Sequence, residues 1–354
     1  MSILKNSSII VAGIIISNAL AYIFHIYVGR SLGPADYGIF GALIALMTIL
    51  SLPSSAFGSG VVKYSAKLNE KKEYGKIGFL RRMMQDRMLL FGAIVLLFIV
   101  MLSSAIANYL NISSNVSVMV MGVSLIFALI SPINRGVLQG MKKYKAYSLN
   151  AIIESSSRLV LVIGLLFLGL KVNGAVLAYG LAYFIAFLAI FPLIKETKKK
   201  QKFEINGFYR FVILVFFVNL IIQLIINAPT IFIKHFFSSE FTGLWNAALT
   251  LSRVSIFVTT GISLVMFSEV AGSDNIKRKR SIFKKTLFLT IVASVGIALI
   301  FWLVPGIFIS LLYGSAYLGA VPILQWMSVA MIFIAVIQLC ASYWMASLRG
   351  ENGK

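Results

Sequence analysis

The sequence predicts an all-α integral membrane protein, and three observations carry this prediction. Of its 354 residues, 59% are hydrophobic and 12% are charged, whereas soluble domains carry about 25% charged residues. The mean hydropathy is +0.93, and the apolar residues are gathered into ten runs near the length of about 20 residues that a membrane-spanning helix needs. The basic residues, which give a net charge of +21, lie mostly between these runs. They therefore indicate anionic membrane lipids, and not nucleic acid, as partners.

Each apolar run predicts one membrane-spanning helix. In chain order, the runs cover residues 8–28, 37–58, 88–109, 116–137, 148–169, 174–194, 210–233, 242–268, 287–311 and 320–347. The first run has no small-residue cleavage site after it, so we expect a retained helix and not a signal peptide. The long basic gap at 59–87 has room for an amphipathic helix that lies on the inner leaflet.

The gaps between the runs alternate in charge, which predicts the orientation of the chain. Every second gap is strongly basic, whereas the lysines and arginines of the other gaps are only Arg30, Lys171 and Lys234. Because basic gaps face the cytoplasm, we expect a multi-pass protein of the cell membrane with both termini on the cytoplasmic side. The outward gaps are short and leave no room for an external catalytic domain, so neither an enzyme nor a cofactor is expected.

Two echoes in the sequence predict an internal repeat. Residues 36–38 resemble residues 240–243, and residues 136–140 resemble residues 346–350. Both echoes relate helices of the same orientation, which favours two pseudo-symmetric bundles in parallel arrangement. The predicted parts are an N-terminal lobe of six helices at 1–195, a basic cytoplasmic linker at 196–209 and a C-terminal lobe of four helices at 210–354. Since the second bundle has fewer helices than the first, we expect it to be incomplete.

Several segments at the ends of the runs resemble the loop signatures of a known family. They read Val28-Gly-Arg-Ser-Leu-Gly-Pro-Ala-Asp-Tyr-Gly-Ile-Phe40, Gly58-Ser-Gly-Val-Val-Lys-Tyr64, Gly136-Val-Leu-Gln-Gly140, Phe241-Thr-Gly-Leu-Trp-Asn-Ala-Ala248 and Leu311-Leu-Tyr-Gly-Ser-Ala-Tyr317. With these segments the chain resembles the polysaccharide-biosynthesis, O-antigen-type (Wzx-like) flippases of the MOP exporter superfamily. The resemblance implies two MOP/MATE-like bundles that open alternately to the two sides of the membrane. The implied cargo is a polyprenyl-phosphate-linked oligosaccharide, flipped to the outer leaflet for surface glycan assembly, with glycan-assembly proteins as further partners.

Charged side chains inside the predicted spans are few, and each costs about 2.5 to 3.5 kcal/mol at a helix centre. Glu154 and Arg158 lie four residues apart on one helix face. Arg158 suits a phosphate or diphosphate, because its planar guanidinium matches phosphate oxygens, but the pair could equally serve helix packing alone. Arg253 has no acidic residue within four positions in the sequence. It is predicted to contact an anionic cargo, and the alternatives are a bridge to Glu269 or Glu154, or snorkelling.

Amides and a histidine complete the predicted substrate site. The amides are Asn18 in the first run and Asn219, Gln223 and Asn227, at intervals of four, in the seventh. They suit sugar hydroxyls or, equally, hydrogen bonds between helices. His25 is a candidate for proton coupling, although a packing role is the more common one. With Cys340 as the single cysteine, no cysteine-based metal site or disulfide is expected.

Two other functions remain open at this point. A cation-coupled multidrug or small-molecule exporter of the same superfamily would need acidic residues in its cavity, and the first predicted helix has none. A non-transporting scaffold of a glycan-assembly complex is consistent with an incomplete second bundle. No phosphate-binding Gly-Lys-Ser/Thr motif is present, so an ion gradient, the membrane potential or mass action would drive transport.

Overall fold

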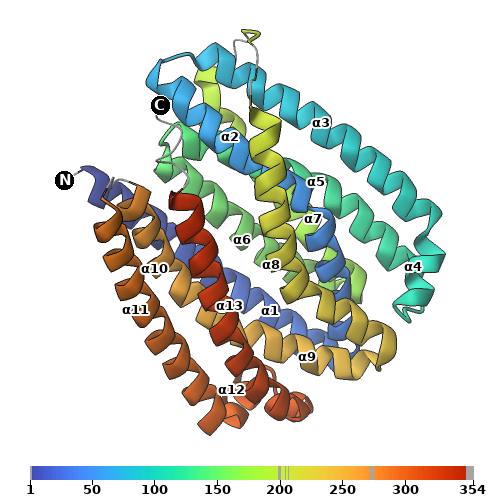
Figure 1. Ribbon diagram of the computed structural model, residues 1–354. Helices are drawn as coiled ribbons and strands as arrows, with labels where there is room; N and C mark the ends of the chain where they lie inside the picture. Colours follow the sequence, from blue (N-terminus) through green and yellow to red (C-terminus); the bar gives the residue numbers. More distant parts are fainter. Residues whose placement is uncertain (1, 198–200, 204, 206, 272–274, 348–354) are drawn as a thin grey trace. The chain divides into compact units, whose positions relative to one another are not determined.

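The computed structural model describes residues 2–197, 201–203, 205, 207–271 and 275–347 (Figure 1). This part of the chain forms thirteen α-helices and two short 3-10 helices, and it contains no strand. Nine of its helical stretches are long and apolar enough to cross a membrane. The structure therefore confirms the predicted all-α class, and all ten apolar runs are helical. Residues 198–200, 204 and 206 of the predicted linker, and residues 348–350 of the second echo, lie outside the described residues.

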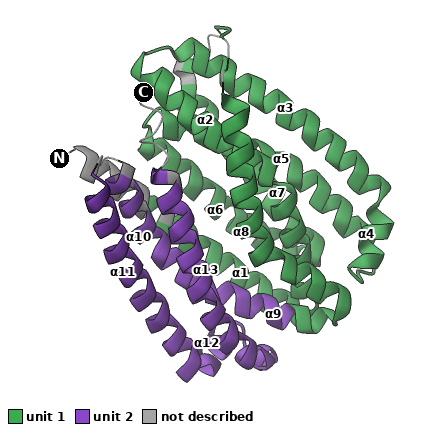
Figure 2. Cartoon of the chain, viewed as in Figure 1, with its two compact units in different colours: residues 1–242 green, residues 243–354 purple. Residues whose placement is uncertain are grey.

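Packing divides the chain into two units, residues 1–242 and 243–354, coloured separately in Figure 2. The helices of the first unit are α1 (Ser2–Leu50), α2 (Leu52–Glu70), α3 (Tyr74–Met101), α4 (Ser103–Tyr109), α5 (Asn115–Gly140), α6 (Tyr144–Phe167), α7 (Lys171–Ile190), the 3-10 helix η1 (Phe191–Thr197) and α8 (Phe208–Phe236). Helix α5 lies at the centre, where it packs against α2, α3 and α7. Helix α6 packs on α1 and α7.

The first two apolar runs are joined without a loop. Helix α1 bends at Gly33, whose φ of +75° is outside the helical region, and Pro34 follows directly. Glycine adopts positive φ without a steric penalty, and proline disfavours the α conformation of the residue before it. These two residues therefore separate the arms of α1 that correspond to the first and second predicted spans.

Residues 59–87 do not form a separate helix of their own. Helix α2 continues to Glu70, α3 begins at Tyr74, and a tight turn joins them. Lys72 in this turn has a φ of +57°. The basic residues thus occupy the ends of two long helices, because the aliphatic stems of lysine and arginine let a helix extend beyond its apolar segment.

Glycine allows α2 and α5 to pack closely. A Cβ atom on Gly136 would lie 2.7 Å from the carbonyl oxygen of Gly58, and one on Gly58 would lie 2.9 Å from the carbonyl oxygen of Pro132. One turn further along α5, a Cβ on Gly140 would lie 2.7 Å from the carbonyl oxygen of Val62. Small residues at intervals of four are typical of closely packed membrane helices, and Gly136 and Gly140 have this spacing.

The C-terminal end of α8 is attached to the turn between α4 and α5. The fully buried amine of Lys234 donates a hydrogen bond of 3.0 Å to the carbonyl oxygen of Asn111. His235 Nδ1 lies 2.6 Å from the carbonyl oxygen of Tyr109, and the two rings stack 4.1 Å apart. Helix α8 also packs on α1 and α2. The seventh predicted span therefore belongs to the first packing unit, while the division into lobes of six and four helices stays a prediction.

The second unit is built mainly from three helices. Its elements are α9 (Ser239–Ser252), which begins just before the unit boundary, α10 (Val254–Ala271), α11 (Ile276–Leu303), α12 (Pro305–Leu312), the 3-10 helix η2 (Ser315–Ala320) and α13 (Val321–Ser347). Helices α10, α11 and α13 pack on one another. Met266, Val270 and Leu339 are fully buried in their core. Asn275 caps α11, because its side-chain oxygen accepts hydrogen bonds from the backbone N–H groups of Lys277 and Arg278.

Candidate functional site

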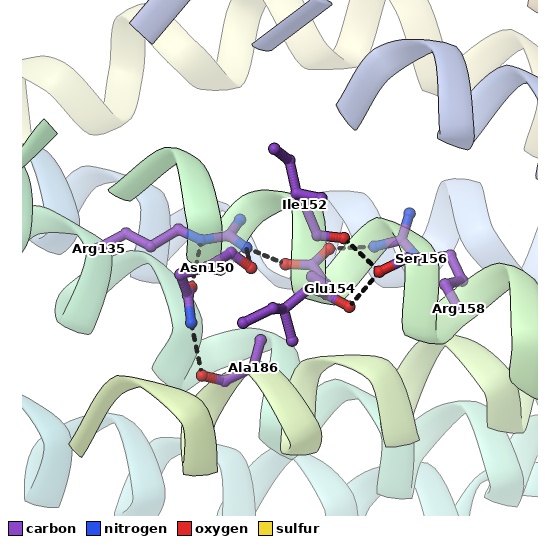
Figure 3. Close-up of polar contacts among 8 residues, drawn as sticks. Arg135, Asn150, Ile152, Glu154, Ser156, Arg158 and Ala186 are labelled. Carbon is purple, nitrogen blue, oxygen red and sulfur yellow. Dashed lines mark hydrogen bonds and ion pairs between the residues drawn. The ribbon is translucent and has the colours of Figure 1, made fainter. Parts of the chain in front are cut away.

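Three charged side chains form a buried cluster between α5 and α6, drawn in Figure 3. The Arg158 guanidinium donates to one carboxylate oxygen of Glu154. The Arg135 Nη2 lies 2.6 Å from the other carboxylate oxygen. Glu154 and Arg158 are buried and Arg135 is partly buried. Two guanidinium groups thus share a single carboxylate, and the cluster carries one net positive charge.

An amide fixes Arg135 in this position. Its Nε donates to the side-chain oxygen of Asn150 over 3.0 Å, and its Nη2 donates to the Asn150 carbonyl oxygen over 3.3 Å. The Asn150 side chain in turn donates to the carbonyl oxygen of Ala186 in α7 over 2.7 Å (Figure 3). The cluster therefore links α5, α6 and α7 through polar contacts.

Aromatic rings enclose the Arg158 side chain. Its Cζ lies 3.9 Å from the centre of the Tyr179 ring, 5.4 Å from that of Tyr183 and 6.0 Å from that of Phe24. Such contacts favour a cation through the negative face of the ring. Within the described residues, the buried Nε of Arg158 has no hydrogen-bond acceptor. One donor of this guanidinium therefore remains available to an acceptor that the described residues do not supply.

His25 lies next to this aromatic cluster. Its Nε2 is 3.2 Å from the Tyr179 hydroxyl, and its Nδ1 is 3.3 Å from the Tyr37 hydroxyl. The imidazole thus connects α7 with the second arm of α1. A hydrogen-bonded histidine of this kind suits a packing role, and its part in proton coupling stays a prediction.

The predicted amides lie elsewhere in the first unit. On α8, the Asn227 side-chain nitrogen donates to the side-chain oxygen of Gln223 over 2.7 Å and to its backbone carbonyl over 3.2 Å. Asn227 is buried, whereas Gln223, Asn219 and Asn18 are half-buried. The regular spacing on α8 therefore brings two of its amides into direct contact.

Arg253 is half-buried at the turn between α9 and α10, in the second unit. Glu269 is exposed near the opposite end of α10. At 1.5 Å per residue, the two positions are about 24 Å apart along the helix, so a bridge between Arg253 and Glu269 is excluded. The role of Arg253 towards a cargo stays a prediction.

Sequence reasoning missed Arg135, Tyr179 and Tyr183. Arg135 lies inside the apolar run at 116–137, two residues before its end. That position was the available signal, since a charge within a run needs a partner. Nothing in the sequence around the two tyrosines indicates their contacts to Arg158, because they lie on α7 and Arg158 lies on α6. Among the described residues, no group of three His, Cys, Asp or Glu side chains could hold a metal ion.

Comparisons with known proteins agree with this architecture. Residues 3–255 match the model of a family described as polysaccharide biosynthesis protein. The chain is 28% identical over 211 residues to an uncharacterized membrane protein of Methanocaldococcus jannaschii, covering 58% of this chain and 48% of the relative. It therefore spans about half the length of the curated relative that it matches.

Solved structures of MOP superfamily transporters have similar folds. A multidrug resistance MATE family transporter of the MOP superfamily, in an inward-facing conformation, matches with a TM-score of 0.78 and 13% identity, over 95% of this chain and 82% of that chain. A MOP superfamily transporter from Pyrococcus furiosus, whose binding pocket is described as having reverse polarity, matches with a TM-score of 0.67 and 14% identity, over 98% and 85%. At such low identity the likeness shows the fold alone, and it confirms the predicted MOP/MATE-like fold.

Proposed function

This chain belongs to the polysaccharide biosynthesis protein family, and we propose that it is a flippase for a polyprenyl-phosphate-linked oligosaccharide. In this proposal the cargo passes by alternating access from the cytoplasmic to the outer leaflet and then enters cell-surface polysaccharide or glycan assembly. The family and the fold are those of membrane transporters. The identity of the cargo is the part that we propose.

The observation that carries this proposal is the excess of positive charge in the buried cluster. A buried charge is costly unless it is paired, and within the described part of the chain the ion pairs of Arg135 and Arg158 both go to Glu154. A phosphate group would supply the missing negative charge and could accept a hydrogen bond from the buried Nε of Arg158. Guanidinium groups bind phosphate oxygens with two parallel hydrogen bonds. The cluster thus suits the phosphate of a lipid carrier better than it suits a cation.

The tyrosines beside the cluster, and the amides elsewhere in the first unit, would serve the rest of the cargo. Tyrosine combines an apolar ring with a hydroxyl, and sugars present both apolar faces and hydroxyl groups. Tyr183 beside Arg158 is half-buried and is suited to such a contact. The amides Asn18, Asn219, Gln223 and Asn227, together with Arg253, stay proposed contacts of the oligosaccharide.

The test uses the full reading frame in a strain from which the gene has been deleted. The strain is complemented with Arg158→Gln, with Arg158→Lys or, as a control, with Arg30→Gln at an exposed position of α1. Lipid-linked glycan is labelled in intact and in opened cells, and protein levels are matched. We expect Arg158→Gln to trap the glycan inside, Arg158→Lys to act partially because lysine lacks the planar fork, and Arg30→Gln to behave as wild type.

Three results would contradict the proposal. If the glycan distribution is unchanged after gene deletion and the strain has no redundant flippase, the lipid-linked oligosaccharide is not the cargo. Loss of drug efflux with normal glycan distribution would favour the cation-coupled exporter. If the Arg158→Gln strain flips glycan normally and surface glycan is lost only in the deletion strain, the scaffold function is favoured.

A further inference from the structure

We infer that α3 binds the headgroup of an anionic membrane phospholipid at a site separate from the buried cluster. A surface groove of about 470 Å³ lies along this helix. It is lined by Phe79, Arg82, Met83, Asp86, Arg87 and Leu90. We call it the α3 groove, and the inference does not depend on the cargo proposed above.

The polar part of the α3 groove has a net positive charge. Arg82 and Arg87 are exposed, and the only acidic lining residue, Asp86, lies 3.1 Å from the Nε of Arg82. Both partners of this ion pair are more than half exposed, so the pair is weak and a phosphate can compete for the guanidinium. The charge of the groove therefore complements a phosphodiester with one negative charge.

An aromatic ring of α8 holds the second arginine in place. The Arg87 Cζ lies 5.2 Å from the centre of the Tyr209 ring. This cation–π contact restrains the guanidinium, whose planar fork of N–H donors suits phosphate oxygens. Arg87 is thus positioned before a ligand arrives.

The apolar part of the site continues along the same face of α3. Leu90, Ile94, Leu97 and Met101 follow Met83 at helical spacing, and Leu90, Leu97 and Met101 are 65%, 60% and 71% exposed. In a membrane-spanning helix, such an exposed apolar face lies against acyl chains. From Leu90 to Met101 the helix rises about 16 Å, close to the thickness of one leaflet's hydrocarbon layer, about 15 Å.

The occupant therefore has an anionic phosphodiester head and acyl chains that lie along α3. The basic gap between the second and third apolar runs is the one that the distribution of lysine and arginine assigns to the cytoplasmic side. A phospholipid of the cytoplasmic leaflet fits this position, with its headgroup in the α3 groove and its chains towards the membrane centre.

The test measures lipid binding by the full chain purified in detergent. Phosphatidylglycerol or phosphatidylcholine is titrated, and bound lipid is counted by native mass spectrometry. The test variant is Arg82→Gln/Arg87→Gln. The matched control is Lys71→Gln/Lys72→Gln, which removes the same charge from exposed residues in the adjacent turn. All variants are first compared by size-exclusion chromatography and helix content.

We expect wild type and the lysine control to bind phosphatidylglycerol in preference to phosphatidylcholine. Because Arg82 and Arg87 line the groove and would contact the phosphodiester directly, the arginine variant should lose about tenfold or more in affinity for phosphatidylglycerol. An equal loss in the lysine control would overturn the inference, since only net charge would matter, and so would an arginine variant that binds as wild type. Binding of polyprenyl phosphate without binding of phosphatidylglycerol would also overturn it, because the groove would then serve a carrier lipid.

Discussion

The close packing of α2 against α5 predicts that Gly136→Ala destabilises the protein. The new Cβ would meet the carbonyl oxygen of Gly58 at 2.7 Å and the side chain of Val61 at 3.3 Å. A backbone carbonyl within a helix cannot move aside as the end of a flexible side chain can. The two helices must therefore separate, or the protein must accept the overlap.

The size of the effect follows from two opposing terms. Overpacking a well-packed core costs about 1–3 kcal/mol, whereas replacing a glycine by alanine in a helix interior gains about 0.5–1 kcal/mol. The midpoints of the two ranges differ by about 1 kcal/mol, which is the net loss that we expect in the free energy of unfolding. Gly164→Ala in α6 is the matched control, because no atom lies within 4 Å of its added Cβ. This variant should be as stable as wild type or slightly more stable.

The assay is denaturant unfolding in detergent micelles, followed by far-ultraviolet circular dichroism. Tryptophan fluorescence is unsuitable, because all four tryptophans lie between residues 245 and 344, in the second unit, whereas Gly136 lies in the first. If Gly136→Ala unfolds at the wild-type denaturant concentration, or if Gly164→Ala loses as much stability, the packing argument is wrong.

Three further substitutions test other features. Glu154→Gln should lower the free energy of unfolding by about 3–5 kcal/mol, because it leaves two arginines without their shared charge; wild-type stability in the same denaturant assay would show that the cluster is hydrated. Lys234→Met keeps most of the side-chain volume but leaves the Asn111 carbonyl without its donor. Thermal unfolding in detergent should therefore show a loss of about 1–3 kcal/mol in the free energy of unfolding. No loss would mean that water replaces the amine. Asn275→Ala should lower the free energy of unfolding by about 1 kcal/mol through loss of the helix cap, whereas Asn275→Asp should retain wild-type stability. Both are followed by tryptophan fluorescence, and equal stability of the two variants would argue against the cap.

The sequence predicts the helices well because apolar length is a local property. The ten runs are mainly helical, with short breaks such as Leu102 and Arg253. Helix α2 extends beyond its apolar segment to Glu70, where composition no longer distinguishes a membrane helix from a surface helix. Glu154 and Arg158 could be paired from their spacing of four residues. Arg135 and Tyr179 could not, because their contacts depend on how α5, α6 and α7 are rotated against one another, and no short segment determines that rotation.

The bend at Gly33 has a practical consequence for experiments on membrane sidedness. One glycine at positive φ joins the two arms of α1, and the His25 and Tyr37 side chains contact each other across this bend. A reporter or epitope inserted there would separate the two arms and break that contact. Failure to detect it could then result from misfolding and would not show on which side of the membrane the bend lies. The turn at residues 71–73, where Lys71 and Lys72 are exposed between two complete helices, offers a better insertion point for mapping which side of the membrane the chain's loops face.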